Sequence, residues 1–280
     1  MSGTSEAPKR QRPVVGNGCV VLLYHIVDSP RTEAERQWCC EPDQFRAQMR
    51  WLRESGYEPI SVGRLDRWLT GGDPLPLNAV CVTFDDGTRC MRDTALPILQ
   101  EYDIPAMSYV VAGLVGGSNT WLRSSGWSQR SLLGVEDLRA LREAGIEIGS
   151  HSMTHADLSD CEAGQRKMEI RDSRNRLEDT IGEPVEHFAY PFGRLNRDAY
   201  ASVQEAGYRT AATVADGVVR RTHDPLLLNR VEVFHWDSLS RFERKVRWGI
   251  ADPTLSLQSI KRITHRVLQR SGLRPRKLTA

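Results

Sequence analysis

The 280-residue chain is about twice the length of an average domain, although a single α/β barrel also reaches this size. Apolar residues make up 40% of it and charged residues 26%, which excludes disordered, collagen-like and coiled-coil proteins because their compositions are strongly skewed. The formal net charge of +2 gives no reason to expect a nucleic acid as partner. These figures indicate an ordinary globular protein.

The first apolar run, Cys19–Val27, is neither a secretory signal nor a membrane span. It follows a polar, partly basic segment, and Tyr24 and His25 interrupt it. It lacks a small-residue cleavage site and is too short to cross a bilayer. We therefore expect a polar segment over residues 1–18 and a cytoplasmic protein. The six cysteines include no CxxC pair, so we expect buried thiols rather than a disulfide scaffold.

From residue 19 to about residue 234, apolar runs of strand length alternate with amphipathic stretches. The expected strands are Cys19–Val27, Ala79–Phe84, Ala106–Ala112, Ile146–Ser150, Phe188–Tyr190, Thr210–Val214 and Leu226–Val233. The expected helices are Gln44–Glu54, Val62–Leu69, Asp93–Tyr102, Val135–Ala144, Gln165–Thr180 and Arg197–Ala206. This alternation predicts an α/β fold with βα units around a mainly parallel sheet, forming one catalytic domain over residues 19–236.

One segment, Gly113–Arg130, is too long for an ordinary connection between such elements. It contains Trp121 and Trp127. The segment is either a loop that faces the substrate or a surface Ω-loop held in place by its two tryptophans.

Two adjacent carboxylates, Asp85 and Asp86, follow the strand Ala79–Phe84 and precede Gly87. Active sites of parallel α/β folds are built at such strand ends. Successive strand residues point to opposite faces, so both carboxylates can serve one site only if the chain bends there, which Gly87 allows. An ordinary turn with two solvated aspartates is the other interpretation.

Two histidines at a spacing of four, His151 and His155, follow the strand Ile146–Ser150. Imidazoles at this spacing can meet one metal ion, and a carboxylate completes a set that leaves positions open for water and substrate. Because the ends of parallel strands gather on one rim, this pattern strengthens the functional interpretation of Asp85 and Asp86.

Two weaker features remain. The residues Tyr190, Pro191, Phe192 and Gly193 form either a turn whose backbone N–H groups hold an oxyanion or a plain β-turn. His25, near the end of the first apolar run, is either functional or an ordinary core histidine.

In their order and spacing, Thr83–Gly87, His151–His155 and Tyr190–Gly193 resemble the first three motifs of the NodB-type polysaccharide deacetylases, the fourth carbohydrate esterase family. The opening Leu22–Val27 further resembles the circularly permuted branch that contains poly-N-acetylglucosamine deacetylases. The resemblance implies a distorted (β/α)7 barrel that hydrolyses N-acetyl groups on sugars with a divalent metal, usually zinc, with cobalt, nickel or iron as alternatives.

Carried over by motif, the resemblance implies a general base at Asp85 and a general acid at His25. The implied metal ligands are Asp86, His151 and His155. The late Leu-x-x-His motif of the family is absent, which favours His25 as the acid, as in the permuted branch.

The third motif departs from the family pattern. Its implied role is to contact the substrate or the oxyanion through Tyr190, Pro191 and the backbone N–H of Phe192. Many members carry an arginine here that orients the base, but Ala189 stands at that position. Arg230, near the last expected strand, is either a substitute for it or a structural arginine.

The expected function is therefore metal-dependent removal of the N-acetyl group from an amino sugar of a glycan, glycolipid or glycoconjugate. The alternatives are hydrolysis of another C–N amide by the same metal site, such as a ureide, a cyclic imide or an N-acyl sugar of secondary metabolism, and a non-catalytic carbohydrate-binding barrel. The sequence leaves the sugar and the oligomeric state open.

The small net charge conceals an uneven distribution. Residues 241–280 hold eleven Lys and Arg against two acidic residues, which gives +9 and leaves −7 for residues 1–240. Apolar residues recur at helical spacing from Leu257 to Val267 with basic residues beside them. We expect a basic helical extension over residues 237–280, which either contacts an anionic membrane or packs on the barrel.

Overall fold

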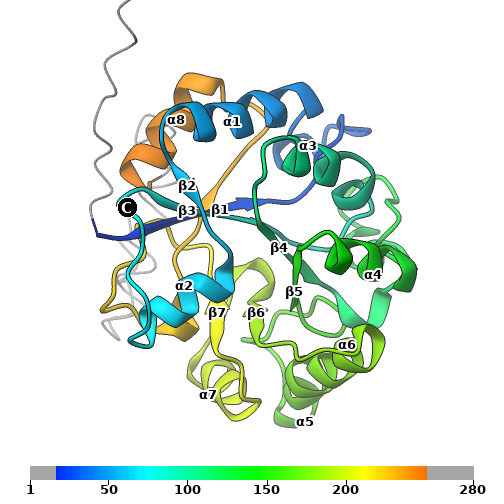
Figure 1. Cartoon of the computed structure of the whole chain (residues 1–280). Helices are drawn as coiled ribbons and strands as arrows, with labels where there is room; N and C mark the ends of the chain where they lie inside the picture. Colours follow the sequence, from blue (N-terminus) through cyan, green and yellow to red (C-terminus); the bar gives the residue numbers. More distant parts are fainter. Residues whose placement is uncertain (1–16, 251–280) are drawn as a thin grey trace, which may run out of the picture.

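The computed structural model of the chain describes residues 17–250. Within them the strands are β1 (Cys19–Tyr24), β2 (Glu58–Pro59), β3 (Ala79–Phe84), β4 (Ala106–Val110), β5 (Glu147–Ser150), β6 (His187–Ala189), β7 (Thr210–Ala212) and β8 (Val231–Glu232). The α-helices are α1 (Pro42–Glu54), α2 (Val62–Leu69), α3 (Leu96–Glu101), α4 (Val135–Glu143), α5 (Ala163–Lys167), α6 (Ser173–Ile181), α7 (Arg197–Glu205) and α8 (Leu239–Trp248). Figure 1 shows the strands at the centre and the helices around them.

The strands form one parallel sheet that curves into a barrel. All pairings between the named strands are parallel, in the order β7-β6-β5-β4-β3-β1-β8, with β2 beside the start of β3. A parallel bridge between Ala212 and Leu228 joins the end of β7 to the segment that leads into β8, so the two ends of the sheet meet. This arrangement confirms the predicted distorted (β/α)7 barrel.

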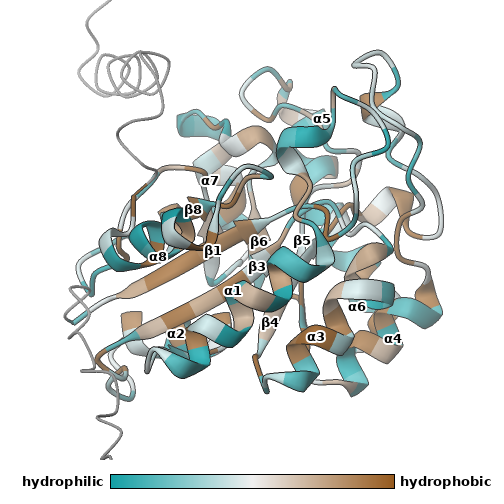
Figure 2. Cartoon of the chain, turned by 90° about the horizontal axis from the view of Figure 1, so that it is seen from above, coloured by the Kyte–Doolittle hydropathy of each residue, from teal (hydrophilic) through white to brown (hydrophobic). Residues whose placement is uncertain are grey.

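The strand residues face two separate hydrophobic cores. Along β1, Val20 and Leu22 pack with residues of the surrounding helices, whereas Cys19 and Val21 belong to a second core inside the barrel. This division follows from the alternation of side chains along a strand. Figure 2 shows the consequence: β1 is hydrophobic along its length, while the helices around the barrel carry both hydrophilic and hydrophobic faces.

Helix α2 closes the barrel at the amino ends of the strands. The Glu147 carboxylate, at the start of β5, accepts hydrogen bonds from the backbone N–H groups of Val62 and Gly63 at the start of α2. Further along the helix, Asp66 pairs with Arg209, which precedes β7. Because this end is sealed by its own side chains, the open end for chemistry is the opposite one.

Several expected elements differ in detail, two of them in ways that matter for the fold. The last expected strand, Leu226–Val233, is reduced to β8 because Pro225–Leu227 forms a 3₁₀ turn, and the Asp224 carboxylate caps that turn at Leu226 N–H. The expected helix Gln165–Thr180 is divided by a π-helical turn, η5 (Met168–Asp172). All six cysteines are free and five are buried, as expected.

The described part of the expected C-terminal extension is α8, which packs against α1. The ring of Phe242 meets Trp51 edge-on at 5.8 Å, and buried Lys245 pairs with buried Asp237 at 2.6 Å. The helix expected around Leu257–Val267 lies outside the described residues. Within residues 17–250, none of the helices has the length and apolar character needed to cross a membrane.

Candidate metal centre and active site

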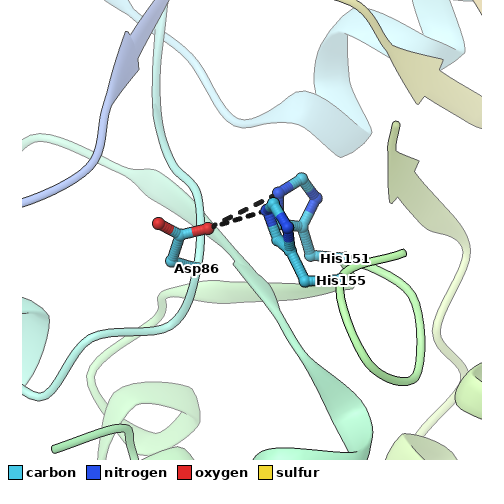
Figure 3. A group of neighbouring side chains, drawn as sticks. All are labelled: Asp86, His151 and His155. Carbon is cyan, nitrogen blue, oxygen red and sulfur yellow. Dashed lines mark ion pairs between the residues drawn. The ribbon is translucent and has the colours of Figure 1, made fainter. Parts of the chain in front are cut away.

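The motif residues meet at the carboxyl end of the barrel, as the sequence predicts. Asp86 follows β3, while His151 and His155 follow β5, and their ligand atoms lie within 4.8 Å of one another. The Nε2 atoms of His155 and His151 lie 3.2 and 3.7 Å from Asp86 Oδ1 (Figure 3). All three side chains are buried.

The backbone reaches this arrangement through left-handed conformations at residues with side chains. Asp86 has φ 73°, Ser152 has φ 68° and His155 has φ 65°. Such conformations cost roughly 1–2 kcal/mol at a residue other than glycine, so the surrounding contacts must enforce them. One of these contacts is local: the Ser152 hydroxyl accepts the backbone N–H of His155.

A buried carboxylate holds the loop between the two histidines. Glu169, on η5, is fully buried and accepts the backbone N–H groups of Met153 and Thr154 as well as the Thr154 hydroxyl. From the other side, Gly113 N–H donates to Met153 O. A Cβ at Gly113 would lie 2.5 Å from Met153 O, so the close approach requires glycine.

The chemistry of the histidines fits a metal ion. His151 Nδ1 donates to the carbonyl oxygen of Ala189 at 2.8 Å, which leaves the lone pair of Nε2 directed at Asp86. Burial lowers the pKa of His151 to about 4, so the ring is neutral near pH 7. Without a cation between them, the Nε2 lone pair and the carboxylate would repel each other.

The Asp86 carboxylate also fits a metal ion. Burial alone would raise its pKa, but the interaction with His155 and the nearby histidines outweighs burial and holds the pKa well below its usual value. Asp86 Oδ1 is buried and lies 3.2 Å from His155 Nε2, but this contact lacks the geometry of a hydrogen bond. Two imidazoles and one carboxylate are a donor set that binds divalent metals and leaves coordination positions open.

Asp85 lies beside this cluster and is held by Arg230. The guanidinium is fully buried, and it binds both Asp85 oxygens, at 2.6 and 2.7 Å. Its Nε donates to Thr213 O, and the cation lies over the Tyr109 ring at 5.5 Å. Burial would raise the pKa of Asp85, but the charge of Arg230 outweighs it, so the pKa is lowered and the carboxylate stays ionised. Arg230 therefore fixes the position of the Asp85 carboxylate.

His25 lies on the same rim. It directly follows Tyr24 of β1, which pairs in register with Phe84 of β3, the residue before Asp85. Its ring packs against Trp38 with centroids 4.9 Å apart. His25 Nδ1 is buried, and no hydrogen-bond partner for it is found within residues 17–250. His25 therefore lies at the same strand ends as the two carboxylates and makes no side-chain hydrogen bond through Nδ1 within the described residues.

The turn after β6 is only partly at the site. The Phe192 ring meets His155 edge-on at 4.5 Å, and Phe192 has φ 56° in the turn η6 (Pro191–Gly193). Pro191 is buried at the start of this turn. Tyr190 does not lie with the cluster, because its buried side chain packs on Phe188 and donates to Leu226 O.

The long loop after β4 faces the site. The Trp121 ring stacks on His155 with centroids 4.7 Å apart and planes 14° apart. Trp127 lies against Trp38 at 6.5 Å. The loop Gly113–Arg130 therefore lies against the cluster, with both of its tryptophans packed on rings of other segments.

The sequence did not reveal two contributors to the site, Glu169 and Trp38. Glu169 is one of several acidic residues in an amphipathic segment, where the sequence pattern gives no reason to expect a buried carboxylate. Trp38 belongs to the connection after β1. Neither carries a local pattern, and only the folded contacts identify them.

A parallel barrel that gathers two histidines and an aspartate at the carboxyl ends of its strands, with a second ionised carboxylate beside them, is typical of metal-dependent hydrolases. Comparison with known families agrees with this class. Residues 73–211 match the family model described as polysaccharide deacetylase. The chain therefore contains a polysaccharide deacetylase domain.

The known proteins to which this chain is similar include several deacetylases. The poly-beta-1,6-N-acetyl-D-glucosamine N-deacetylase of Escherichia coli K12 is 36% identical over 97 residues, which cover 35% of this chain and 14% of that protein. The Streptococcus pyogenes deacetylase PplD, solved in complex with acetate, has a TM-score of 0.72 at 24% identity, over 84% of this chain and 99% of that one. IcaB from Ammonifex degensii has a TM-score of 0.69 at 24% identity, over 84% and 97% of the two chains. The two structures share the fold.

Proposed function

We propose that this protein is a metal-dependent N-deacetylase that hydrolyses the N-acetyl group of an amino sugar in a glycan, releasing acetate and leaving a free amine. The observation that carries the proposal is the juxtaposition of two groups: the cluster of Asp86, His151 and His155, and the ionised Asp85 that Arg230 holds beside it. The name of the Escherichia coli relative supports an N-acetylglucosamine glycan as the substrate class.

Asp86, His151 and His155 would hold the metal, and zinc suits a set of two nitrogen donors and one oxygen donor. Cobalt, nickel or iron could occupy the same donors. When bound, the metal supplies a Lewis acid that polarises the acetyl carbonyl and makes water a better nucleophile.

Asp85 is the proposed general base. Arg230 binds both of its oxygens, which keeps the carboxylate ionised and its plane fixed. Asp85 Oδ2 lies 3.8 Å from His151 Nε2, so the base lies next to the proposed metal position. From there the carboxylate can take a proton from water that attacks the acetyl carbon.

His25 is the proposed general acid, and the turn after β6 is the proposed oxyanion site. His25 lies on the same rim as Asp85 and Asp86 and can donate a proton to the departing amine. The contact between the Phe192 ring and His155 brings the backbone of that turn beside the cluster. Its N–H would stabilise the negative charge that develops on the acetyl oxygen.

A series of variants tests these roles. Asp85→Asn should keep its metal and lose roughly 10²–10⁴-fold in turnover, since it removes only the base. His25→Ala should also keep its metal and turn over slowly, whereas His151→Ala should lose both metal and activity. Metal content by elemental analysis and acetate release from N-acetylglucosamine oligomers measure the two properties separately.

The outcomes discriminate between functions. Wild-type turnover in Asp85→Asn would remove the base assignment. A wild-type protein that binds metal but releases no acetate would point to another C–N amide, and one that does neither would point to a non-catalytic carbohydrate-binding barrel.

Residues 17–250 do not test three further predictions. The division into segments 1–18, 19–236 and 237–280, the membrane contact of the basic C-terminal helix and the cytoplasmic location stay predictions. Co-sedimentation with anionic vesicles of the intact chain and of a chain ending at Trp236 tests the membrane contact.

A further inference from the structure

The two histidines of the cluster are held in different ways. The His151 ring is fixed by a hydrogen bond, because its Nδ1 donates to Ala189 O at 2.8 Å. The His155 ring directs its Nε2 at the same Asp86 carboxylate (Figure 3), but its Nδ1 is buried and has no hydrogen-bond partner within residues 17–250. A histidine that binds a metal ordinarily has such a partner, which sets the orientation of its ring. His155 therefore needs another kind of contact for this purpose.

Three aromatic rings surround the His155 imidazole. The Trp121 indole lies parallel to it, with centroids 4.7 Å and planes 14° apart. The Phe192 and His151 rings stand nearly perpendicular to it, with centroids 4.5 and 4.8 Å away. His155 itself is buried. Because close-packed rings resist rotation of a neighbour, these contacts restrict the orientation of the imidazole, and Trp121 covers one of its faces.

The loop that carries Trp121 is held by its own hydrogen bonds. Asn119, two residues earlier, accepts the backbone N–H of Arg130 through Oδ1 at 2.8 Å and donates through Nδ2 to Ser128 O at 3.1 Å. Asn119 is only 5% exposed. These bonds join the two halves of the loop without any ligand. The indole is therefore in place to orient His155 before a metal ion binds.

Stacking on an indole also favours the metal-bound state of a histidine. An imidazole that shares the Nε2 lone pair with a cation becomes electron-poor. The face of an indole is electron-rich, and it attracts positive charge more strongly than the rings of Tyr and Phe do. The contact between Trp121 and His155 should therefore strengthen when His155 binds a metal ion, and this difference adds to the metal affinity.

We propose that Trp121 is a positioning residue for the metal centre. It holds the His155 imidazole in the orientation that a divalent cation requires, in place of the hydrogen bond that holds His151. This inference rests on the proposed function, because it takes His155 as a ligand. It adds a determinant of metal affinity outside the three ligands.

The test compares the two tryptophans of the same loop. Trp121→Leu removes the stacked ring, and Trp127→Leu is the matched control, because Trp127 lies against Trp38 and not against a proposed ligand. Zinc is titrated calorimetrically into the metal-free proteins without substrate. One lost stacking contact should weaken zinc binding roughly two- to tenfold in Trp121→Leu, and Trp127→Leu should bind zinc as the wild type does. Unchanged affinity in Trp121→Leu would overturn the proposal.

A third variant and a spectrum separate positioning from damage to the loop. Trp121→Phe keeps an aromatic ring and should recover much of the zinc affinity. When cobalt replaces zinc, its visible absorption bands report the geometry of the ligands. The bands should change shape in Trp121→Leu and keep the wild-type shape in Trp121→Phe and Trp127→Leu. Wild-type bands in Trp121→Leu, or equal losses of zinc affinity in Trp121→Leu and Trp121→Phe, would contradict a positioning role.

Acetate release separates this proposal from the proposed function. If zinc affinity depends on Trp121 but the wild type releases no acetate from N-acetylglucosamine oligomers, the positioning role stands and only the reaction fails. If the wild type releases acetate and Trp121→Leu binds zinc normally, the reaction stands and the positioning role fails. A wild-type protein that binds no zinc or cobalt would remove both.

Discussion

The two ends of the barrel make their left-handed turns with different residues. At the amino ends of the strands, the turns that follow α1, α4, α6 and α7 use Gly56, Gly145, Gly182 and Gly207, and only the turn after α3 uses another residue, Asp103. At the carboxyl ends, Gly87 and Gly193 also have positive φ, but so do four residues with side chains: Asp86, Ser152, His155 and Phe192.

The turns at the amino ends only reverse the direction of the chain, whereas the turns at the carboxyl ends also position side chains of the site. Glycine adopts positive φ without strain, so the amino end reverses direction at little cost. At the carboxyl end a side chain is needed at the strained position, because Asp86 and His155 are cluster residues and Ser152 holds His155 N–H. The strain there must be offset by buried contacts such as those of Glu169.

The largest expected effect tests the buried ion pair of Glu35 and Arg130 at the carboxyl end, in which the guanidinium donates to both carboxylate oxygens. Glu35→Gln leaves the Arg130 charge without its main partner and should lower the free energy of unfolding by about 3 kcal/mol, measured by urea denaturation at pH 7. Asp66→Asn at the amino end is the control, and its effect should be smaller because its partner Arg209 is 45% exposed. Equal losses in the two variants would contradict the difference between the ends.

The loss of stability in Glu35→Gln should also depend on pH. Burial alone would raise the pKa of Glu35, but the hydrogen bond from Arg130 and others outweigh it, and the pKa falls from 4.5 to about 2. A lowered pKa contributes stability above pH 4.5 that is lost as pH falls toward 2. The stability difference between wild type and Glu35→Gln should therefore shrink across this range.

An intermediate effect concerns the loop that carries the histidines. Glu169→Ala should weaken zinc binding to the metal-free protein about 10–100-fold, since three hydrogen bonds to Met153 and Thr154 are lost. Calorimetric titration with zinc measures the affinity without any substrate. Glu169→Gln should recover much of it, because an amide oxygen can still accept both backbone N–H groups.

Glu178→Ala is the matched control for this loop. Glu178 on α6 also accepts a backbone N–H, that of Val185, but it does not bond to the histidine loop. The variant should bind zinc as the wild type does. Unchanged affinity in Glu169→Ala would mean that the loop holds its shape without the carboxylate.

The smallest effect tests the amino end. Gly145 has φ +82° and open space where a Cβ would lie, so Gly145→Ala should cost about 1 kcal/mol of stability through backbone strain and leave turnover unchanged. Gly164→Ala in α5 also has open space but no positive φ, and it should raise stability by roughly 0.5–1 kcal/mol. Thermal unfolding measures both, and equal signs would refute the strain argument.

The sequence predicts the parts of the site that follow strand ends. Asp86, His151 and His155 are close in space because parallel strands end on one rim, and periodicity alone reveals those strands. The pairing of Asp85 with Arg230 could not be derived in this way, since it requires knowing that β8 lies beside β1. The pair of Glu35 and Arg130 likewise joins two loops with no regular pattern.

The late position of Arg230 in the sequence also sets the order in which the residues of the site are synthesised. A chain made from its N-terminus contains Asp86, His151 and His155 well before it contains the arginine that holds Asp85. The residues proposed to hold the metal therefore precede, in synthesis, the residue that binds the proposed base. A chain interrupted between His155 and Arg230 would contain the three proposed ligands and lack the partner of Asp85.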